Sequence, residues 1–237
     1  MLKHFFVGLL AVCLSTGGWA AELNQDSFDP LFMPEMERVL SQSRVLYGRD
    51  VLRFGQNLSY GMNNRLVFSA DVNYQNDFAG DEDGFSSVDL GGVYRVATAS
   101  DSNAQIISDV IFGFKFGGSS HVRTPYFADS TYYAGWRFGR QWAGLTLSGT
   151  IKSSWVFDSE RGMSFIDFIP EAYFRVAPDW RLGAGATIRK ATNPNYDQEW
   201  LNFKVVRQYG RTQYAGIVNY EFEDDTVQIG LGVNILF

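Results

Sequence analysis

The feature that most constrains the fold of this 237-residue chain is a two-residue repeat of apolar side chains that recurs along most of its length. The last twelve residues, TVQIGLGVNILF, show it most clearly. Every second position from Val227 to Phe237 is apolar, and Gly, Gln or Asn fill most positions between them. Successive side chains of a β-strand point to opposite faces, so this period predicts a strand with one apolar and one polar face.

Ten further segments between residues 50 and 222 repeat the pattern, as in Leu66 to Tyr74, Val88 to Val96 and Trp180 to Ile188. The composition agrees with many strands, since the chain has 24 glycines, an aromatic content of 16% and only six prolines. We therefore expect an all-β fold with at least eleven strands.

Two all-β folds would explain such strands: a soluble β-sandwich and a transmembrane β-barrel. The polar faces favour the barrel, because they carry Gly, Ser, Thr and Asn with scattered Arg and Asp rather than many Lys and Glu. Aromatic residues such as Tyr60, Tyr94 and Trp180 collect near the strand ends, as in the two girdles of a barrel in a bilayer. The sequence predicts a transmembrane antiparallel up-and-down β-barrel, which must close because an open edge would leave backbone groups unpaired in hydrocarbon.

The first twenty residues are predicted to be a cleavable signal peptide. Lys3 and His4 precede an apolar run from Phe5 to Leu14, and Gly18 and Ala20 are the small residues expected before a cleavage site. The run is too short to cross a bilayer, which needs ~20 apolar residues. Cys13, the only cysteine, lies within it, so the mature chain would have no disulfide and no thiolate metal site.

A leader, repeated strands of about ten residues and an apolar last strand ending in Phe237 resemble the outer-membrane β-barrel proteins of Gram-negative bacteria. The resemblance implies a location in the cell outer membrane, in contact with its lipid, with the C-terminus in the periplasm. It also implies that the barrel-assembly machinery reads the last strand, and we take Val233, Ile235 and Phe237 as this assembly signal.

Loop lengths set the expected strand number. Counting back from a periplasmic C-terminus places the long connections 76–84, 117–129 and 193–199 outside, and short turns such as 139–141 inside. An even number of strands then requires one more near residues 38–47. We expect twelve strands in a barrel domain of residues 38–237, preceded by a periplasmic tail or plug of residues 21–37. The alternative is ten strands, with residues 28–48 as a helix or plug.

The polar faces of the strands would line the lumen. They carry nine cations and six acids in a chain whose net charge of −6 would become −7 on loss of Lys3. The surplus of cations would favour anions, since rings of charged side chains select ions in pores. The alternative is that the charges pair across the lumen and stabilise the wall. The predicted lumen-lining residues are Arg53, Asp71, Asp89, Arg95, Asp109, Lys115, Arg137, Lys152, Asp167, Glu171, Arg175, Arg181, Arg189, Lys204 and Glu221.

We therefore expect a porin-like channel for passive diffusion of small hydrophilic solutes, acidic ones among them, and neither an enzyme nor a cofactor-dependent protein. The acidic balance argues against nucleic acid as a partner. No metal site is expected, because one histidine and no cysteine would remain after cleavage. The oligomeric state is left open.

Two alternatives remain. A barrel hydrolase acting on lipid or peptide would resemble the outer-membrane deacylases, phospholipases and omptins, whose sites use histidine. Here the mature chain would hold only His121, and Arg123 stands where the first two families place serine. A closed structural barrel whose acidic outer loops bind a partner is the other alternative.

Overall fold

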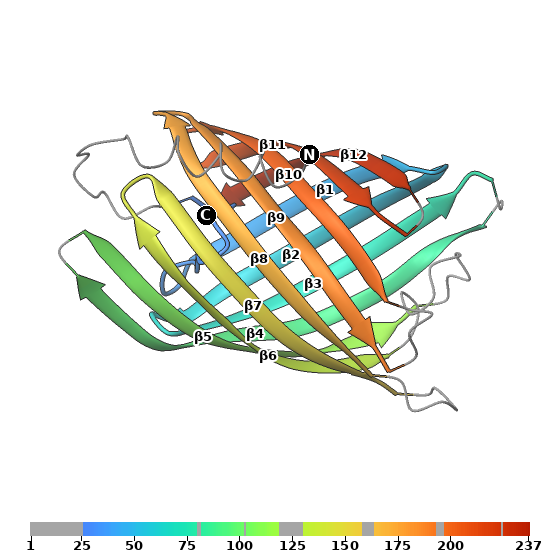
Figure 1. Cartoon of the computed structure of the whole chain (residues 1–237), viewed down its shortest axis with the longest axis horizontal. Helices are drawn as coiled ribbons and strands as arrows, with labels where there is room; N and C mark the ends of the chain where they lie inside the picture. The colour runs from blue at the N-terminus through green and yellow to red at the C-terminus, as the bar shows by residue number, and fades with distance from the viewer. Residues whose placement is uncertain are drawn as a thin grey trace.

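The protein folds into a closed antiparallel barrel of twelve strands (Figure 1). The computed structural model describes residues 26–79, 82–101, 103–118, 130–157, 164–192, 197–223 and 225–237. The strands are β1 (Val39–Gly48), β2 (Val51–Asn63), β3 (Leu66–Asp77), β4 (Glu82–Asp101), β5 (Ala104–Gly117), β6 (Thr131–Trp142), β7 (Leu145–Val156), β8 (Ser164–Ala177), β9 (Trp180–Ala191), β10 (Gln198–Tyr209), β11 (Thr212–Glu221) and β12 (Thr226–Leu236).

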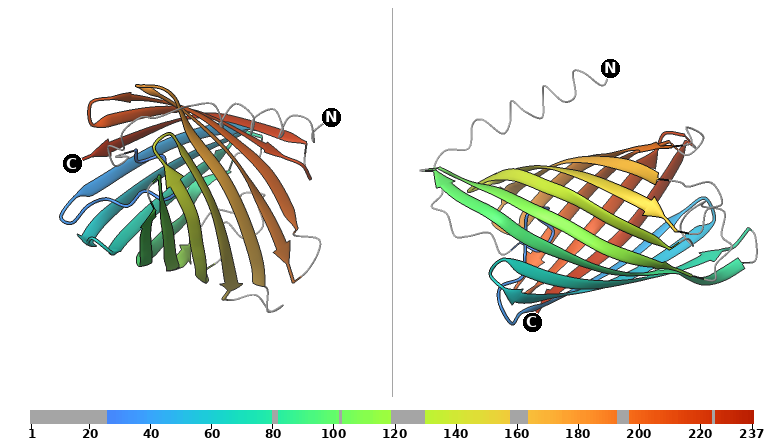
Figure 2. Two further views of the ribbon diagram at one scale, coloured as in Figure 1. Left: turned by 60° about the vertical axis from the view of Figure 1, so that its left-hand side comes forward. Right: turned by 90° about the horizontal axis from the view of Figure 1, so that it is seen from below.

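The barrel closes between its first and last strands. Each strand pairs with the next along the chain, and β1 also pairs with β12, in a register that runs from Leu40 opposite Leu236 to Tyr47 opposite Ile229. The strands cross the molecule obliquely and surround a central space (Figure 2). The prediction of twelve strands is confirmed, and the ten-strand alternative is wrong, because residues 39–48 form a paired strand.

The connections differ between the two ends of the barrel. At the end that holds the C-terminus, all five strand connections are two residues long: 64–65, 102–103, 143–144, 178–179 and 210–211. At the opposite end, β1 and β2 are joined by Arg49 and Asp50, whose φ angles of 50° and 61° are those of a tight type I′ hairpin. The other connections at that end are longer, as predicted for an outer-membrane barrel.

Two predicted connections are wrong. The connection predicted at residues 76–84 is only residues 78–81, because β3 runs to Asp77 and β4 begins at Glu82. Residues 139–141 are part of β6, with Gly139 opposite Ser148, and the turn lies at residues 143–144. Gly139 is needed for close packing instead. A Cβ atom there would lie 2.5 Å from the carbonyl oxygen of Leu147 and 2.7 Å from Cδ1 of Leu31. The glycine therefore allows residue 31, far away in sequence, to approach the wall.

Large apolar side chains lie on the outside of the barrel and charged side chains lie on the inside, the reverse of a soluble protein. Leu231 and Ile229 are 70% and 57% exposed on the outside of β12, whereas Asp109 and Asp167 are at most 1% exposed on the inside. Large apolar residues are exposed on the outer face of strand after strand. This is the arrangement expected when lipid surrounds the barrel and polar groups face its lumen. The described part of the chain contains no helix long and apolar enough to cross a membrane.

Aromatic side chains lie on the outer face near both ends of the barrel. Tyr132 and Trp155 stack with ring centroids 4.9 Å apart at the end of the long connections. At the end that holds the C-terminus, the Arg207 guanidinium lies 5.4 Å from the centre of the Trp180 ring. Such rings prefer the level of lipid headgroups, so the two sets are consistent with the predicted girdles.

Candidate pore lumen

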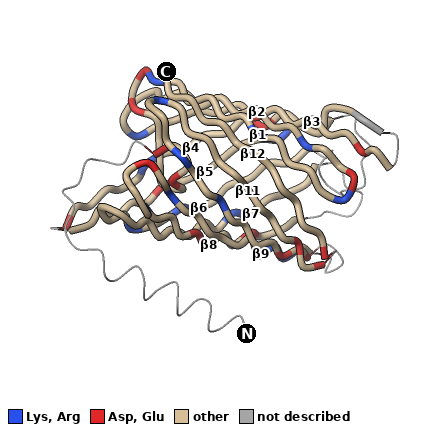
Figure 3. The backbone as a smooth tube through the Cα atoms, turned by 90° about the horizontal axis from the view of Figure 1, so that it is seen from above, with Lys and Arg blue, Asp and Glu red and all other residues tan. Residues whose placement is uncertain are grey.

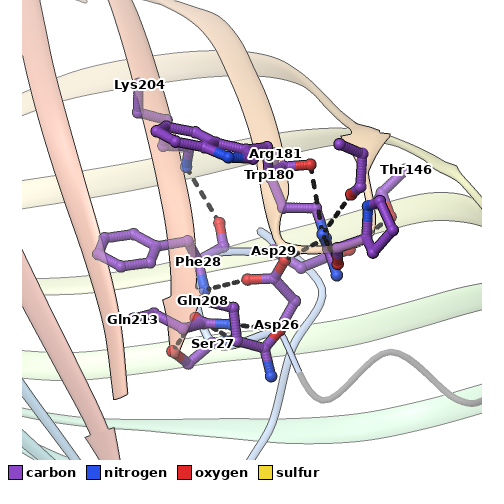
Figure 4. Close-up of polar contacts among 12 residues, drawn as sticks. Asp26, Ser27, Phe28, Asp29, Thr146, Trp180, Arg181, Lys204, Gln208 and Gln213 are labelled. Carbon is purple, nitrogen blue, oxygen red and sulfur yellow. Dashed lines mark hydrogen bonds and ion pairs between the residues drawn. The ribbon is translucent and has the colours of Figure 1, made fainter. Parts of the chain in front are cut away.

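Residues 26–37 are here called the N-terminal segment. Its first residues lie inside the barrel at the end that holds the C-terminus (Figure 4), and residues 35–37 are exposed and lead into β1. Ser27 donates to Oε1 of Gln213 on β11 through both its backbone N–H and its hydroxyl. Its hydroxyl also accepts a hydrogen bond from Nδ2 of Asn234 on β12. Leu31 is 2% exposed, so the segment is packed against the inner wall.

Three cations of the wall hold the backbone of this segment. Arg95 and Arg137 donate to the carbonyl oxygens of Leu31 and Pro30, each at 2.7 Å. Lys204 donates to the carbonyl oxygen of Phe28 at 3.1 Å. All three cations were predicted to line the lumen. In the structure their side chains bond the N-terminal segment on the inner side of the wall, so part of their hydrogen-bonding capacity is used by the chain itself.

The acids of the segment add further anchors. Asp26 forms an ion pair with Arg181 of β9 at 3.1 Å, and both side chains are almost fully buried. The Asp29 carboxylate accepts hydrogen bonds from Gln141 and Thr146. Because these partners come from different strands, the segment is tied to the wall at several points around the lumen.

One side of the lumen, here called the paired wall, carries buried ion pairs. It is formed by β4 to β7 and by the ends of β8 and β9 that lie farthest from the C-terminus. Asp109 on β5 lies between Arg95 and Arg137 of the adjacent strands, with 2.9 Å from Nε of Arg95 to the carboxylate. Asp167 bonds Arg189 at 2.7 Å and Lys152 of β7 at 3.3 Å. Each carboxylate is therefore shared by two cations, as in the alternative interpretation of the predicted lumen charges, but two acids against four cations leave two positive charges in excess. Figure 3 shows the charged residues along the barrel.

Tyr133 of β6 extends this wall toward β4. Its hydroxyl donates to Asp89 at 3.0 Å, and its ring crosses two glycines, Gly113 and Gly91. A Cβ atom on Gly113 would lie only 2.4 Å from the ring, so glycine is required for this close approach. Lys115 of β5 lies within electrostatic reach of the same carboxylate. Tyr133 was not predicted as a lumen residue, although its place on the polar face of β6 was.

The opposite side of the lumen, formed by the rest of β8 and β9, by β10 to β12 and by β1 to β3, is here called the cavity wall. It borders a cavity of about 410 Å³, whose lining mixes uncharged polar residues such as Gln42, Asn57 and Asn202 with charged and apolar ones. Two looser ion pairs face this space: Arg44 lies 3.7 Å from Asp71, and Lys204 lies 3.6 Å from Glu171.

A second cavity, of about 310 Å³, lies beside the N-terminal segment and is lined by Pro30, Phe32 and Pro34 together with the wall. Four residues line both cavities: Phe28, Gln42, Asn57 and Lys204. The two cavities therefore adjoin one another beside the N-terminal segment.

The remaining predicted residues lie near the ends of the barrel. Arg53 and Glu221 interact electrostatically at the end opposite the C-terminus. Arg175 is exposed at the end that holds the C-terminus, opposite Arg181 in the β8–β9 register. The predicted assembly signal lies on the last strand, with Val233 and Ile235 in β12 and Phe237 exposed at the terminus.

Sequence reasoning missed Arg44, because no inner face was assigned to residues 38–47. The exposed Val45 and Tyr47 mark the outer face of this strand, and the same alternation would have placed Arg44 inside. His121, on which the hydrolase alternative depends, lies outside the described residues. Within the described ranges, no group of three His, Cys, Asp or Glu residues could hold a metal ion.

Comparison with known proteins gives a fold but no family. No protein-family profile matches the chain, and no curated protein matches it in sequence. Among solved structures, KdgM porin superposes with a TM-score of 0.61 at 13% identity, over 83% of this chain and 98% of that porin. NanC porin gives 0.61 at 11% identity, over the same shares of the two chains.

Two further structures show how widely this fold is used. An outer-membrane channel from Pseudomonas putida F1 has a TM-score of 0.57 at 8% identity, covering 91% of this chain and all of the channel. Outer-membrane phospholipase A from Escherichia coli has 0.50 at 11% identity, covering 89% and 94%. Channels and an enzyme are both represented, so the likeness does not identify an activity. At these identities it establishes the fold, a closed antiparallel β-barrel like those of outer-membrane proteins.

Proposed function

We propose that this protein is a porin-like channel of the outer membrane that lets small hydrophilic solutes diffuse passively. The observation that carries the proposal is the pair of cavities, which share Phe28, Gln42, Asn57 and Lys204 and adjoin one another beside the N-terminal segment. The apolar outer face supports a location in a bilayer. The likeness to two porins and an outer-membrane channel agrees with it at the level of fold.

The proposal includes a preference for anions, but a weak one. The surplus of wall cations favours negative solutes. However, Arg181 is neutralised by Asp26, and three other cations hold carbonyl oxygens of the N-terminal segment. In the larger cavity Arg44 faces Asp71 and Lys204 faces Glu171, so a passing ion meets as many negative as positive side chains.

We also propose that the N-terminal segment narrows the channel, since its backbone crosses the lumen and borders the second cavity. Export by a leader of residues 1–20 and recognition of Val233, Ile235 and Phe237 by the barrel-assembly machinery complete the proposal. The resemblance of the sequence to outer-membrane proteins supports both.

Single-channel recording from purified, folded protein in a planar bilayer tests the main claim. We expect discrete openings in potassium chloride and, under a salt gradient, a reversal potential shifted slightly toward that of chloride. Folding is checked separately by the different gel mobility of boiled and unboiled samples. Folded protein that gives no openings would reject the channel.

A further inference from the structure

A small polar cluster lies on the outer face of β1 and β2, in the middle of the barrel wall. It consists of Ser41, Ser43 and Gln56, and Gln56 stands directly opposite Ser43 in the strand register. The residues around it on this face are apolar: Val45, Phe54 and Leu58 are 39%, 42% and 50% exposed. The cluster therefore interrupts a surface that otherwise suits lipid.

The contacts of Gln42 and Arg44 show that the two serines point outward, and Gln56 shares the face of its exposed neighbours Phe54 and Leu58. Arg44, between the two outward positions Ser43 and Val45, reaches Asp71 and Asn73 of β3 over the inner face of β2. Gln42 donates to the carbonyl oxygen of Ser27 in the N-terminal segment. Because side chains alternate along a strand, Ser41 and Ser43 face the outside.

The cluster is hydrogen-bonded within itself, but its bonding is incomplete. The Ser43 hydroxyl donates to Oε1 of Gln56 at 2.5 Å, and Nε2 of Gln56 donates to Oγ of Ser41 at 3.0 Å and to the carbonyl oxygen of Asn57 at 3.2 Å. Ser41 thus accepts a hydrogen bond, and its own O–H has no acceptor among the described residues. Oγ of Ser43 and Oε1 of Gln56 still have lone pairs to offer.

Hydrocarbon cannot complete this set, because it contains no hydrogen-bonding groups. The free donor, the Ser41 hydroxyl, and the free acceptors, Oγ of Ser43 and Oε1 of Gln56, lie on the same patch. If a twofold axis relates two copies of the chain, Ser41 of each copy can donate to these acceptors in the other, so the contact forms twice. We propose that two copies of this protein associate in the membrane through the outer faces of β1 and β2, with Ser41, Ser43 and Gln56 at the centre of the contact.

The small side chains of the cluster fit this role. Serines at positions 41 and 43 let another surface approach the backbone more closely than the flanking Phe54 and Leu58 do, as small residues do in other membrane contacts. Polar side chains also add directional bonds where the hydrophobic effect supplies no force between apolar surfaces. The lumen of each barrel stays separate in such a dimer.

Cross-linking through single cysteines tests the contact. In a Cys13→Ala background that contains no other cysteine, Ser43→Cys is compared with Ile151→Cys, which is equally outward and central but lies on β7, on the far side of the barrel. Each protein is purified, reconstituted into phospholipid vesicles and treated with a short bis-maleimide. We expect covalent dimers from Ser43→Cys and few from Ile151→Cys. Equal yields would mean random collision and would overturn the proposal.

Gln56→Leu in the Ser43→Cys protein tests whether the polar cluster drives association. Because hydrogen bonds between membrane segments stabilise their association, loss of the Gln56 amide should lower the dimer association constant roughly 3- to 20-fold. Asn57→Leu, next in sequence but facing the lumen, should leave dimerisation unchanged. Heat-modifiable gel mobility confirms that each variant is folded. Wild-type protein that is monomeric in vesicles, or dimers that Gln56→Leu does not weaken, would overturn the proposal.

Discussion

The two sides of the lumen use charge in different ways. On the paired wall, Asp109 is fully buried and sits within bonding distance of two arginines. On the cavity wall, Arg44 and Asp71 stay 3.7 Å apart, and the Arg44 side chain is 53% exposed to the lumen. The same kinds of residue therefore form close, buried contacts on one side and more exposed, loosely matched pairs on the other.

This difference indicates a division of tasks within one barrel. Buried ion pairs have poor access to water and cannot exchange partners easily, so the paired wall supports the shape of the barrel. Separating two hydrated charges costs little free energy, so the charged side chains of the cavity wall can interact with solutes that pass through the lumen. Changing matched residues on the two sides tests this interpretation.

The largest effect is expected from Asp109→Asn. It leaves Arg95 and Arg137 without their shared carboxylate, and removing one partner from a buried pair costs about 3–5 kcal/mol. Asp71→Asn is the matched change on the cavity wall and should cost less than about 1 kcal/mol, since that pair is loose and hydrated. Urea unfolding in lipid, followed by tryptophan fluorescence, measures both. Equal losses of unfolding free energy would remove the distinction between the walls.

Deleting residues 26–34 should increase the single-channel conductance, because it removes the backbone that borders the second cavity. The deletion ends before β1 begins at Val39, so strand pairing is retained. The paired wall should also lose stability, because Arg95 and Arg137 lose their carbonyl acceptors. Unchanged conductance from a folded deletion variant would show that the segment does not limit flow.

Charge changes on the cavity wall should alter ion selectivity more than changes on the paired wall. Lys204 lines both cavities, and an ion passing at 4 Å in water feels about 1 kcal/mol from one charge. Lys204→Gln should therefore lower the anion-to-cation permeability ratio roughly fivefold at most. Lys152→Gln, which removes a cation bonded to Asp167, should shift the reversal potential less. The opposite ranking would place the ion path along the other wall.

The smallest effect concerns the ion pair of Lys190 and Asp197 at the end opposite the C-terminus, whose side chains are 61% and 28% exposed. It serves as a reference for the ion pairs of both walls. A hydrogen bond from the backbone N–H of Ala191, and then the ammonium of Lys190, hold the pKa of Asp197 below its usual value of 3.8. The lowered pKa means that this contact stabilises the fold above about pH 4 and is lost as the pH falls through the lowered value.

Carboxyl NMR titration of Asp197 in micelles measures this effect. Lys190→Ala should leave most of the depression in place, since the Ala191 N–H is the larger cause. It should leave the unfolding midpoint unchanged, because exposed pairs contribute little. A return of the Asp197 pKa to its usual value in Lys190→Ala would instead assign the effect to the ion pair.

The alternation of side chains was enough to predict the faces of the strands, because a period of two depends only on local geometry. It placed Asp109, Arg95 and Arg137 inside. It could not show that they bond one another, since this depends on the registers of two strand pairs and on a β-bulge between Arg95 and Ala97. Burial of the irregular segment 26–37 likewise depends on contacts with residues more than one hundred positions away.

The position of the N-terminal segment has a consequence for the order of assembly. Ser27 bonds Gln213 and Asn234, which follow it by 186 and 207 residues, so the earliest described residues wait for partners in the last two strands. Contacts between such distant residues form late, because closing so long a loop of chain is slow. Docking of the segment should therefore be the final step of folding. Protection of residues 26–37 from protease would then report that the barrel has closed.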